Sequence, residues 1–143
     1  MAFDNYNYGT GLSNVGSYQV SGKPFMSGGI AVTVASSPIK ISFPTVTKWI
    51  YVSSSAAVKV GMTSRGTVGN ANANDGIHYF KVNTAGGQKL PSLELKCTEL
   101  YLSSSVGGDA VVDVVAGLTG IAIERITNIS LSGSNWSGSI GIG

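Results

Sequence analysis

Apolar and polar residues alternate in short runs along most of this chain. In the runs 39–43 and 58–62 every second residue is apolar, which places one face of a strand on a core and the other toward solvent. Gly, Ser and Pro separate the runs, and no stretch of good helix formers follows a 3.6-residue period. The pattern predicts an all-β fold of about eight strands with essentially no helix. The expected strands cover residues 17–21, 29–35, 39–43, 46–53, 57–63, 77–82, 93–102 and 110–115.

The run 93–102 changes phase along its length. Leu93 and Cys97 share one parity, whereas Leu100 and Leu102 share the other. A single strand keeps its apolar residues on one face, so it needs one extra residue to restore the phase. We therefore expect a β-bulge near residues 98 and 99.

One sequence pattern occurs twice, at a spacing of 50 residues. Residues 50–55 read Ile-Tyr-Val-Ser-Ser-Ser and precede the apolar run 57–61, and residues 100–105 read Leu-Tyr-Leu-Ser-Ser-Ser before the run 110–114. Each copy is interpreted as strand, Ser-rich turn and strand, which predicts two similar hairpins. Together with about eight strands, they favour a jelly-roll-like antiparallel β-sandwich. An immunoglobulin-type sandwich of about seven strands is the alternative.

The 143 residues fit a single domain with an arm at each end. Residues 1–15 carry no apolar period and are expected to form an N-terminal arm, followed by the sandwich over 16–121 and a C-terminal arm over 122–143. The C-terminal arm alternates apolar residues with Ser and Gly, so we expect it to add a strand to its own or a neighbouring sheet. The interface candidates in the arms are Tyr6, Tyr8, Ile129, Leu131, Trp136 and Ile140.

Charged residues make up only 11% of the chain, against roughly 25% in an ordinary soluble domain. A surface with so little charge is covered by small polar residues or hidden in contacts, and both favour an assembly component. The net charge is +2 and the basic residues stand singly, so nucleic acid is not expected as a partner. The longest nearly apolar run, 110–123, contains Asp113 and is shorter than the roughly 20 residues of a membrane-spanning helix. We expect no membrane contact, and the single cysteine suits assembly in a reducing host cytoplasm.

Side chains able to carry catalysis are scarce. The chain has one His, one Cys and seven carboxylates, without the spacings of a zinc site. His78 is interpreted as an ordinary strand or loop-edge residue, and Asp109 and Asp113 as surface charges rather than a cation site. The glycine-rich stretches lack the Lys-Ser/Thr ending of a phosphate loop. We expect no enzyme activity and no catalytic, cofactor-binding or metal-binding residues.

Two features are candidates for binding. Trp49 and Tyr51 share one parity, opposite to Ile50 and Val52, so they are expected to face outward and to form an apolar patch with Tyr101 if the two repeated hairpins lie together. Subunit contact is the favoured role of this patch, with sugar stacking as the alternative. The stretch 64–75 is expected to be an exposed loop, which serves either binding or plain connection.

The chain also resembles small virion proteins of tailed phages, especially those that infect cyanobacteria. The resemblance covers roughly residues 15–121. It rests on the segments Val-Gly-Ser-Tyr-Gln-Val-Ser-Gly-Lys-Pro-Phe at 15–25, Ile-Ser-Phe-Pro-Thr-Val-Thr-Lys at 41–48, Leu-Lys-Cys-Thr-Glu-Leu-Tyr-Leu-Ser at 95–103 and Ala-Gly-Leu-Thr-Gly-Ile at 116–121.

This resemblance implies a jelly-roll decoration (cement) protein on the surface of the phage capsid, which oligomerises, often as a trimer, and clamps the major capsid protein. Small jelly rolls also serve as vertex pentons and as fibre or tail components, and these roles remain alternatives, as does a carbohydrate-binding module that contacts a host glycan. The resemblance carries no site residues that could be transferred to this chain.

Overall fold

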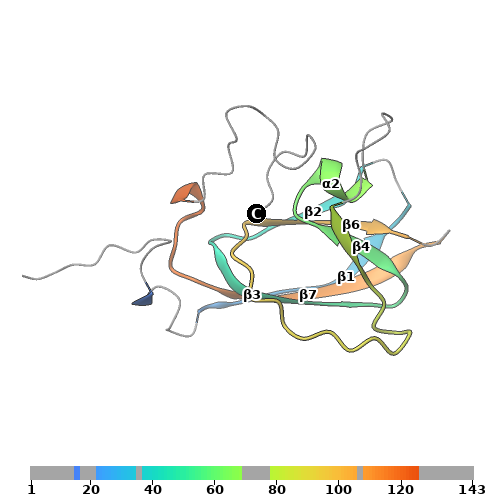
Figure 1. The fold of residues 1–143 in the computed structure, drawn as a ribbon, viewed down its shortest axis with the longest axis horizontal. Coiled ribbons are helices and arrows are strands. Elements are labelled where there is room, and N and C mark those ends of the chain that lie inside the picture. The colour runs from blue at the N-terminus through green and yellow to red at the C-terminus, as the bar shows by residue number, and fades with distance from the viewer. Residues whose placement is uncertain (1–14, 17–21, 35–36, 69–77, 106–107, 126–143) are drawn as a thin grey trace, which may run out of the picture.

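The computed structural model describes residues 15–16, 22–34, 37–68, 78–105 and 108–125. Their fold is all-β, with strands in two antiparallel sheets that pack face to face (Figure 1). Sheet A has the order β1 (Pro24–Val32), β7 (Ala110–Leu118) and β3 (Thr47–Ser54). Sheet B has the order β2 (Ile39–Ser42), β6 (Glu99–Ser104), β4 (Val58–Gly61) and β5 (Tyr79–Val82).

The strand order is that of a jelly roll. Strands from the first half of the chain pair antiparallel with strands from the second half in mirrored order: β1 with β7, β2 with β6, and β4 with β5. The remaining position, beside β3, is taken by an isolated antiparallel bridge between Ile50 and Leu93. The predicted jelly-roll-like sandwich is therefore confirmed, with seven strands and one bridge among the described residues. The expected strand at 17–21 lies outside them.

The prediction of one bulged strand over residues 93–102 is wrong. Leu93 pairs with Ile50 at the edge of sheet A, whereas β6 begins at Glu99 in sheet B. The parity of the apolar residues changes where the chain crosses from sheet A to sheet B. It changes because the two sheets face the shared core from opposite sides. Register shifts occur instead in β1, between Ser27 and Ile30, and at the start of β3.

The two repeated Ser-rich turns are corners between the sheets and not hairpins. β3 and β4 belong to different sheets, and so do β6 and β7. The corners are bonded to each other: the Ser55 N–H donates to the Val111 carbonyl over 2.9 Å, and the Ser105 N–H donates to the Ala57 carbonyl over 3.0 Å. The repeat therefore reflects two adjacent crossings at one end of the sandwich.

A five-residue helix, α2 (Ser64–Val68), begins the stretch that was expected to be an exposed loop. Thr63 caps it, because its hydroxyl accepts the Gly66 N–H over 2.9 Å and its carbonyl accepts the Thr67 N–H over 3.1 Å. Figure 1 shows α2 on the side of sheet B that faces away from sheet A. Gly66 and Thr67 are buried there, so this part of the loop prediction is wrong. Residues 69–75 of the stretch lie outside the described residues.

The core lies between the sheets and consists mainly of Val, Ile and Leu. Phe25 and Phe43 pack at the core in an edge-to-face ring contact, with 5.0 Å between the ring centroids. Cys97 is fully enclosed, and this burial raises the pKa of its thiol. A 3-10 turn over Ile123–Arg125 ends the described part of the chain.

Candidate interaction surface

The outer side of sheet A gathers two of the predicted interface residues. Ile50 and Val52 are 0% and 3% exposed in the core, so the alternating residues Trp49 and Tyr51 face away from it, as expected. The same alternation places ten paired residues on this side, which we call the sheet A outer surface. They are Pro24, Met26 and Ala31 of β1, Trp49, Tyr51 and Ser53 of β3, and Val111, Asp113, Val115 and Gly117 of β7.

Tyr101 does not join this surface, and the expected three-aromatic patch is wrong. Leu100 and Leu102 face the core from sheet B, so Tyr101 faces outward on the opposite side of the sandwich. The two corners do lie together, but Trp49 and Tyr101 belong to strands in different sheets. Because the outer faces of the two sheets point in opposite directions, adjacent corners do not bring their outward aromatics together.

Cross-strand register organises the sheet A outer surface into rows. Met26, Val115 and Tyr51 are directly opposite one another across β1, β7 and β3. Met26 is 74% exposed, and its long apolar side chain stands at the open end of this row. Neighbours on one face at this spacing are in contact range, so the row forms a continuous apolar strip.

The next row explains why Trp49 is only half-exposed. Pro24 and Trp49 flank Gly117, and a Cβ at Gly117 would overlap the indole nitrogen of Trp49. The indole therefore lies directly on the Gly117 backbone. Gly117 is not among the residues predicted from sequence to lie at an interface, although a Gly inside a strand such as β7 is a known sign of close approach by another group.

Asp113 is the only charged residue among the ten of the sheet A outer surface, and its carboxylate is engaged locally. Its Oδ1 accepts the Gly29 N–H over 2.7 Å. Gly29 has a φ of +68°, a backbone conformation that glycine adopts without strain, at the register shift of β1. The carboxylate thus holds the irregular part of the edge strand, and the rest of the surface is uncharged.

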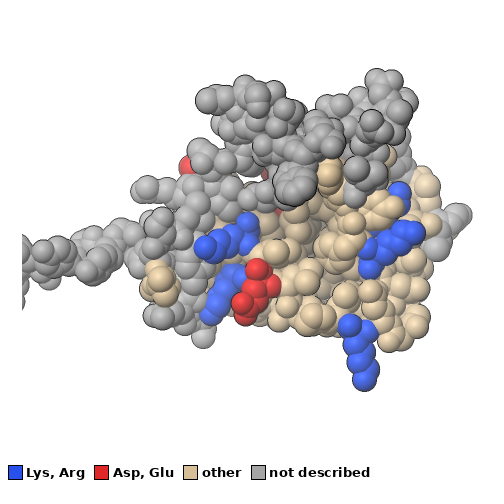
Figure 2. Space-filling view, in the orientation of Figure 1, with Lys and Arg blue, Asp and Glu red and all other residues tan. Residues whose placement is uncertain are grey.

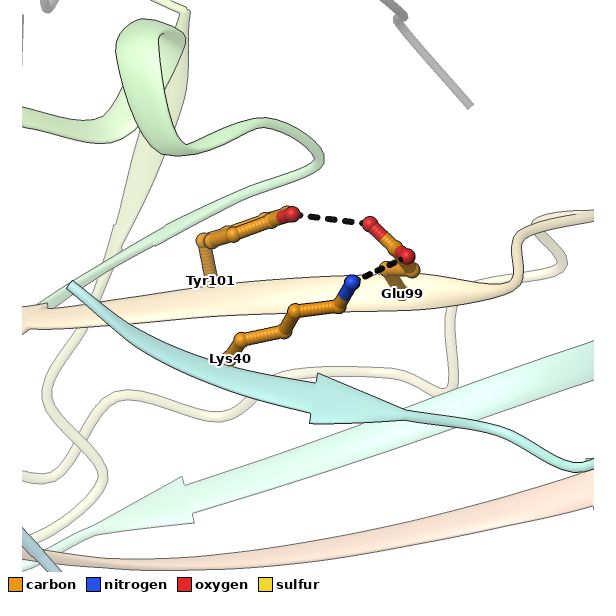
Figure 3. Close-up of polar contacts among 3 residues, drawn as sticks. All are labelled: Lys40, Glu99 and Tyr101. Atoms are coloured by element: carbon orange, nitrogen blue, oxygen red, sulfur yellow. Dashed lines mark hydrogen bonds and ion pairs between the residues drawn. The ribbon is translucent and has the colours of Figure 1, made fainter.

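The outer side of sheet B is more polar and carries the one ion pair found among the described residues. Lys40 of β2 and Tyr101 of β6 both bond to Glu99, at 2.5 Å and 2.8 Å (Figure 3). Partial burial alone would raise the pKa of Glu99, but these two hydrogen bonds outweigh it and lower the pKa below its ordinary value. The hydrogen bond to Glu99 raises the pKa of Lys40, and burial together with the same carboxylate raises that of Tyr101.

Replacing Glu99 with Gln should destabilise the protein by about 0.5 kcal/mol at neutral pH, since both partners of the pair are part-exposed. Because folding lowers the pKa of Glu99, the stabilisation that its carboxylate provides is fully present above roughly pH 4.3, the ordinary pKa of Glu. The difference between wild type and variant should vanish as the pH falls through the lowered pKa. Urea unfolding over a pH series measures it, with Glu94→Gln as an exposed control. A difference that stays constant into strong acid would contradict this role.

The remaining sequence candidates are dispersed or lie outside the described residues. The backbone N–H of His78 donates to the Gly66 carbonyl over 3.0 Å, next to α2. The described residues contain no group of three or more His, Cys, Asp or Glu side chains placed to hold a metal ion. The arm candidates Tyr6, Tyr8, Ile129, Leu131, Trp136 and Ile140 lie outside the described residues.

Charge is sparse on the side of the molecule drawn in Figure 2. Lys, Arg, Asp and Glu occupy a few separate places there, and most of the described surface is formed by other residues. None of the described helices is long and apolar enough to cross a membrane.

Comparison of the chain with protein-family models, with curated proteins and with solved structures finds no match in any of the three.

Proposed function

We propose that this protein is a virion structural protein that decorates and cements the capsid of a tailed phage, and that it acts through extended surfaces rather than through catalysis. The sheet A outer surface is the observation that carries this proposal. It offers apolar side chains in adjoining rows, and its one carboxylate is already bonded to Gly29. The partners are other copies of this chain, with a trimer favoured, and the major capsid protein.

The physical support is the free energy of covering apolar surface. Burial stabilises by about 25 cal/mol for each Å² of apolar area, so a continuous strip gains more from contact than scattered residues do. Met26 and Val111 are 74% and 47% exposed, in different rows of this surface. A chain with only 11% charged residues also meets little like-charge repulsion when copies pack together.

The edges of sheet A support a contribution from the C-terminal arm. The segment after β5 covers β3: Thr84 bonds to Ser54, Leu93 to Ile50, and the Cys97 carbonyl to the Thr47 N–H. Among the described strands, β1 pairs only with β7. This edge of β1, unpaired among the described strands, is therefore where a strand from residues 122–143, of the same or a neighbouring copy, would add by main-chain pairing.

Sedimentation of the purified chain at several concentrations tests self-association. A species near three times 14.6 kDa supports the trimeric cement protein, whereas five times that mass supports a vertex penton. A double variant in which both Met26 and Val111 are replaced by Asp should self-associate about tenfold more weakly or worse. Each new carboxylate would have to lose its water when the surface is covered by a second copy. Val34→Asp is the matched control, since Val34 is 61% exposed but lies beyond the end of β1. Equal effects from both variants, or a wild-type chain that stays monomeric, would contradict the proposal.

A carbohydrate-binding module is the second candidate, favoured by the two aromatic side chains in adjacent rows of β3. Trp49 and Tyr51 are both half-exposed on one face, as required for stacking against a sugar ring. Glycan-array binding that is lost in Trp49→Ala would favour this function, and an array without signal would argue against it.

A further inference from the structure

Two lysines stand directly opposite each other on the outer side of sheet B. The register pairs Lys59 of β4 with Lys81 of β5. Their strand neighbours Val58, Val60 and Val82 are fully buried, so alternation turns both lysines away from the core. Side chains opposite on one face have Cβ atoms about 4.5–5.5 Å apart, which brings the two ammonium groups within reach of a single ligand.

This arrangement is unfavourable for the isolated fold. Like charges directly opposite across two strands destabilise a sheet. The third lysine on this face, Lys40, is neutralised by Glu99, but neither Lys59 nor Lys81 has an ion-pair partner among the described residues. Within the described part of the chain, these two positive charges thus have no ion-pair partner at neighbouring positions, in a chain that carries few charges at all.

Lys59 is also held in place. Its ammonium lies 4.7 Å from the centroid of the Tyr79 ring, which comes from the same strand as Lys81. A cation over an aromatic face is attracted to it and loses part of its freedom before any ligand arrives. Ordering the charge in advance reduces the entropy lost on binding.

We propose that Lys59 and Lys81, with Tyr79 beside Lys59, form a second docking site that binds carboxylates of an acidic protein surface. A carboxylate placed between the ammonium groups accepts a hydrogen bond from each and removes the repulsion between them. Two lysines are too few for a nucleic acid, which needs many phosphate contacts in a row. The proposal rests on the proposed function only in taking the partner to be a protein. It does not depend on the sheet A outer surface, which lies on the other side of the sandwich.

A short glutamate-rich peptide is the probe, with a glutamine-rich peptide of the same length as its neutral match. Titration at low salt, followed by backbone amide NMR shifts, should move signals of Lys59, Tyr79 and Lys81 with the acidic peptide only. Replacing both lysines with Gln should weaken binding by about tenfold or more. Lys89→Gln removes an exposed lysine from the segment after β5 and should change the affinity less than about twofold.

Lys81→Glu separates binding from folding. It replaces a like-charge pair by an opposite-charge pair, so it should abolish peptide binding while leaving the melting temperature unchanged or higher. The proposal is overturned if the double Gln variant binds the acidic peptide as wild type does, or if Lys89→Gln weakens binding equally. It is also overturned if a sulfated oligosaccharide binds these lysines more tightly than the peptide. Sedimentation of the double Gln variant should match wild type, so failure of this site is distinguishable from failure of self-association.

Discussion

Replacing Ile50 with Ala should destabilise the protein by about 2–5 kcal/mol, the range for truncating a large aliphatic side chain in a packed core. Ile50 is fully buried in β3, is paired with Ala116 of β7, and forms the bridge to Leu93 on its other side. Its small cross-strand neighbour Ala116 has little side chain with which to fill the cavity. Urea unfolding followed by intrinsic fluorescence measures the loss.

Val111→Ala is the control for Ile50. Val111 is 47% exposed on the sheet A outer surface, so its truncation leaves no enclosed cavity and should change the free energy of unfolding by less than about 1 kcal/mol. Equal losses in the two variants would show that Ile50 does not lie at the centre of the core.

Replacing Thr47 with Val should destabilise the protein by about 1–3 kcal/mol, although the two side chains have nearly the same shape. The Thr47 hydroxyl is fully buried, donates to the Leu95 carbonyl over 2.6 Å and accepts the Cys97 N–H over 3.0 Å. The methyl group of Val can do neither, so the buried Cys97 N–H and the part-buried Leu95 carbonyl would lose this partner. The effect should appear as a lower urea midpoint with an unchanged slope.

Thr45→Val provides a matched control two residues away. The Thr45 hydroxyl is also buried but has no hydrogen-bond partner among the described residues. Its replacement by a methyl group should be neutral or slightly stabilising, because no bond is lost and a buried polar group is removed. Similar losses at both positions would mean that Thr47 acts through its shape and not through its hydrogen bonds.

Thr47 also fixes the course of the segment that covers the edge of β3. The hydroxyl bonds to Leu95 and Cys97 where the chain passes from the Leu93 bridge in sheet A toward β6 in sheet B. Covering this edge prevents unwanted strand pairing there. In the proposed assembly, a strand that adds to sheet A would then pair at β1 rather than at β3.

Local alternation was sufficient to predict several of the described strands and the direction of their side chains. Runs such as 39–43 and 57–63 became β2 and β4, and Ile50 and Val52 point inward while Trp49 and Tyr51 point outward. The reason is that a strand's two faces repeat every second residue, whatever the strand pairs with. The jelly-roll-like sandwich was also predicted, from the number of short runs and from the two repeated turns, although these turns proved to be corners and not hairpins.

Only the tertiary structure decided which sheet each strand joins and which residues meet across strands. The repeated Ser-rich turns look like hairpins in sequence, yet each carries the chain into the other sheet, and Tyr101 therefore lies on the opposite side from Trp49. Register placed Gly117 beneath Trp49 and Lys59 opposite Lys81, pairs separated by many residues in the chain. Parity is a property of one strand, whereas sheet membership and register are set by long-range packing of the two faces around a shared core.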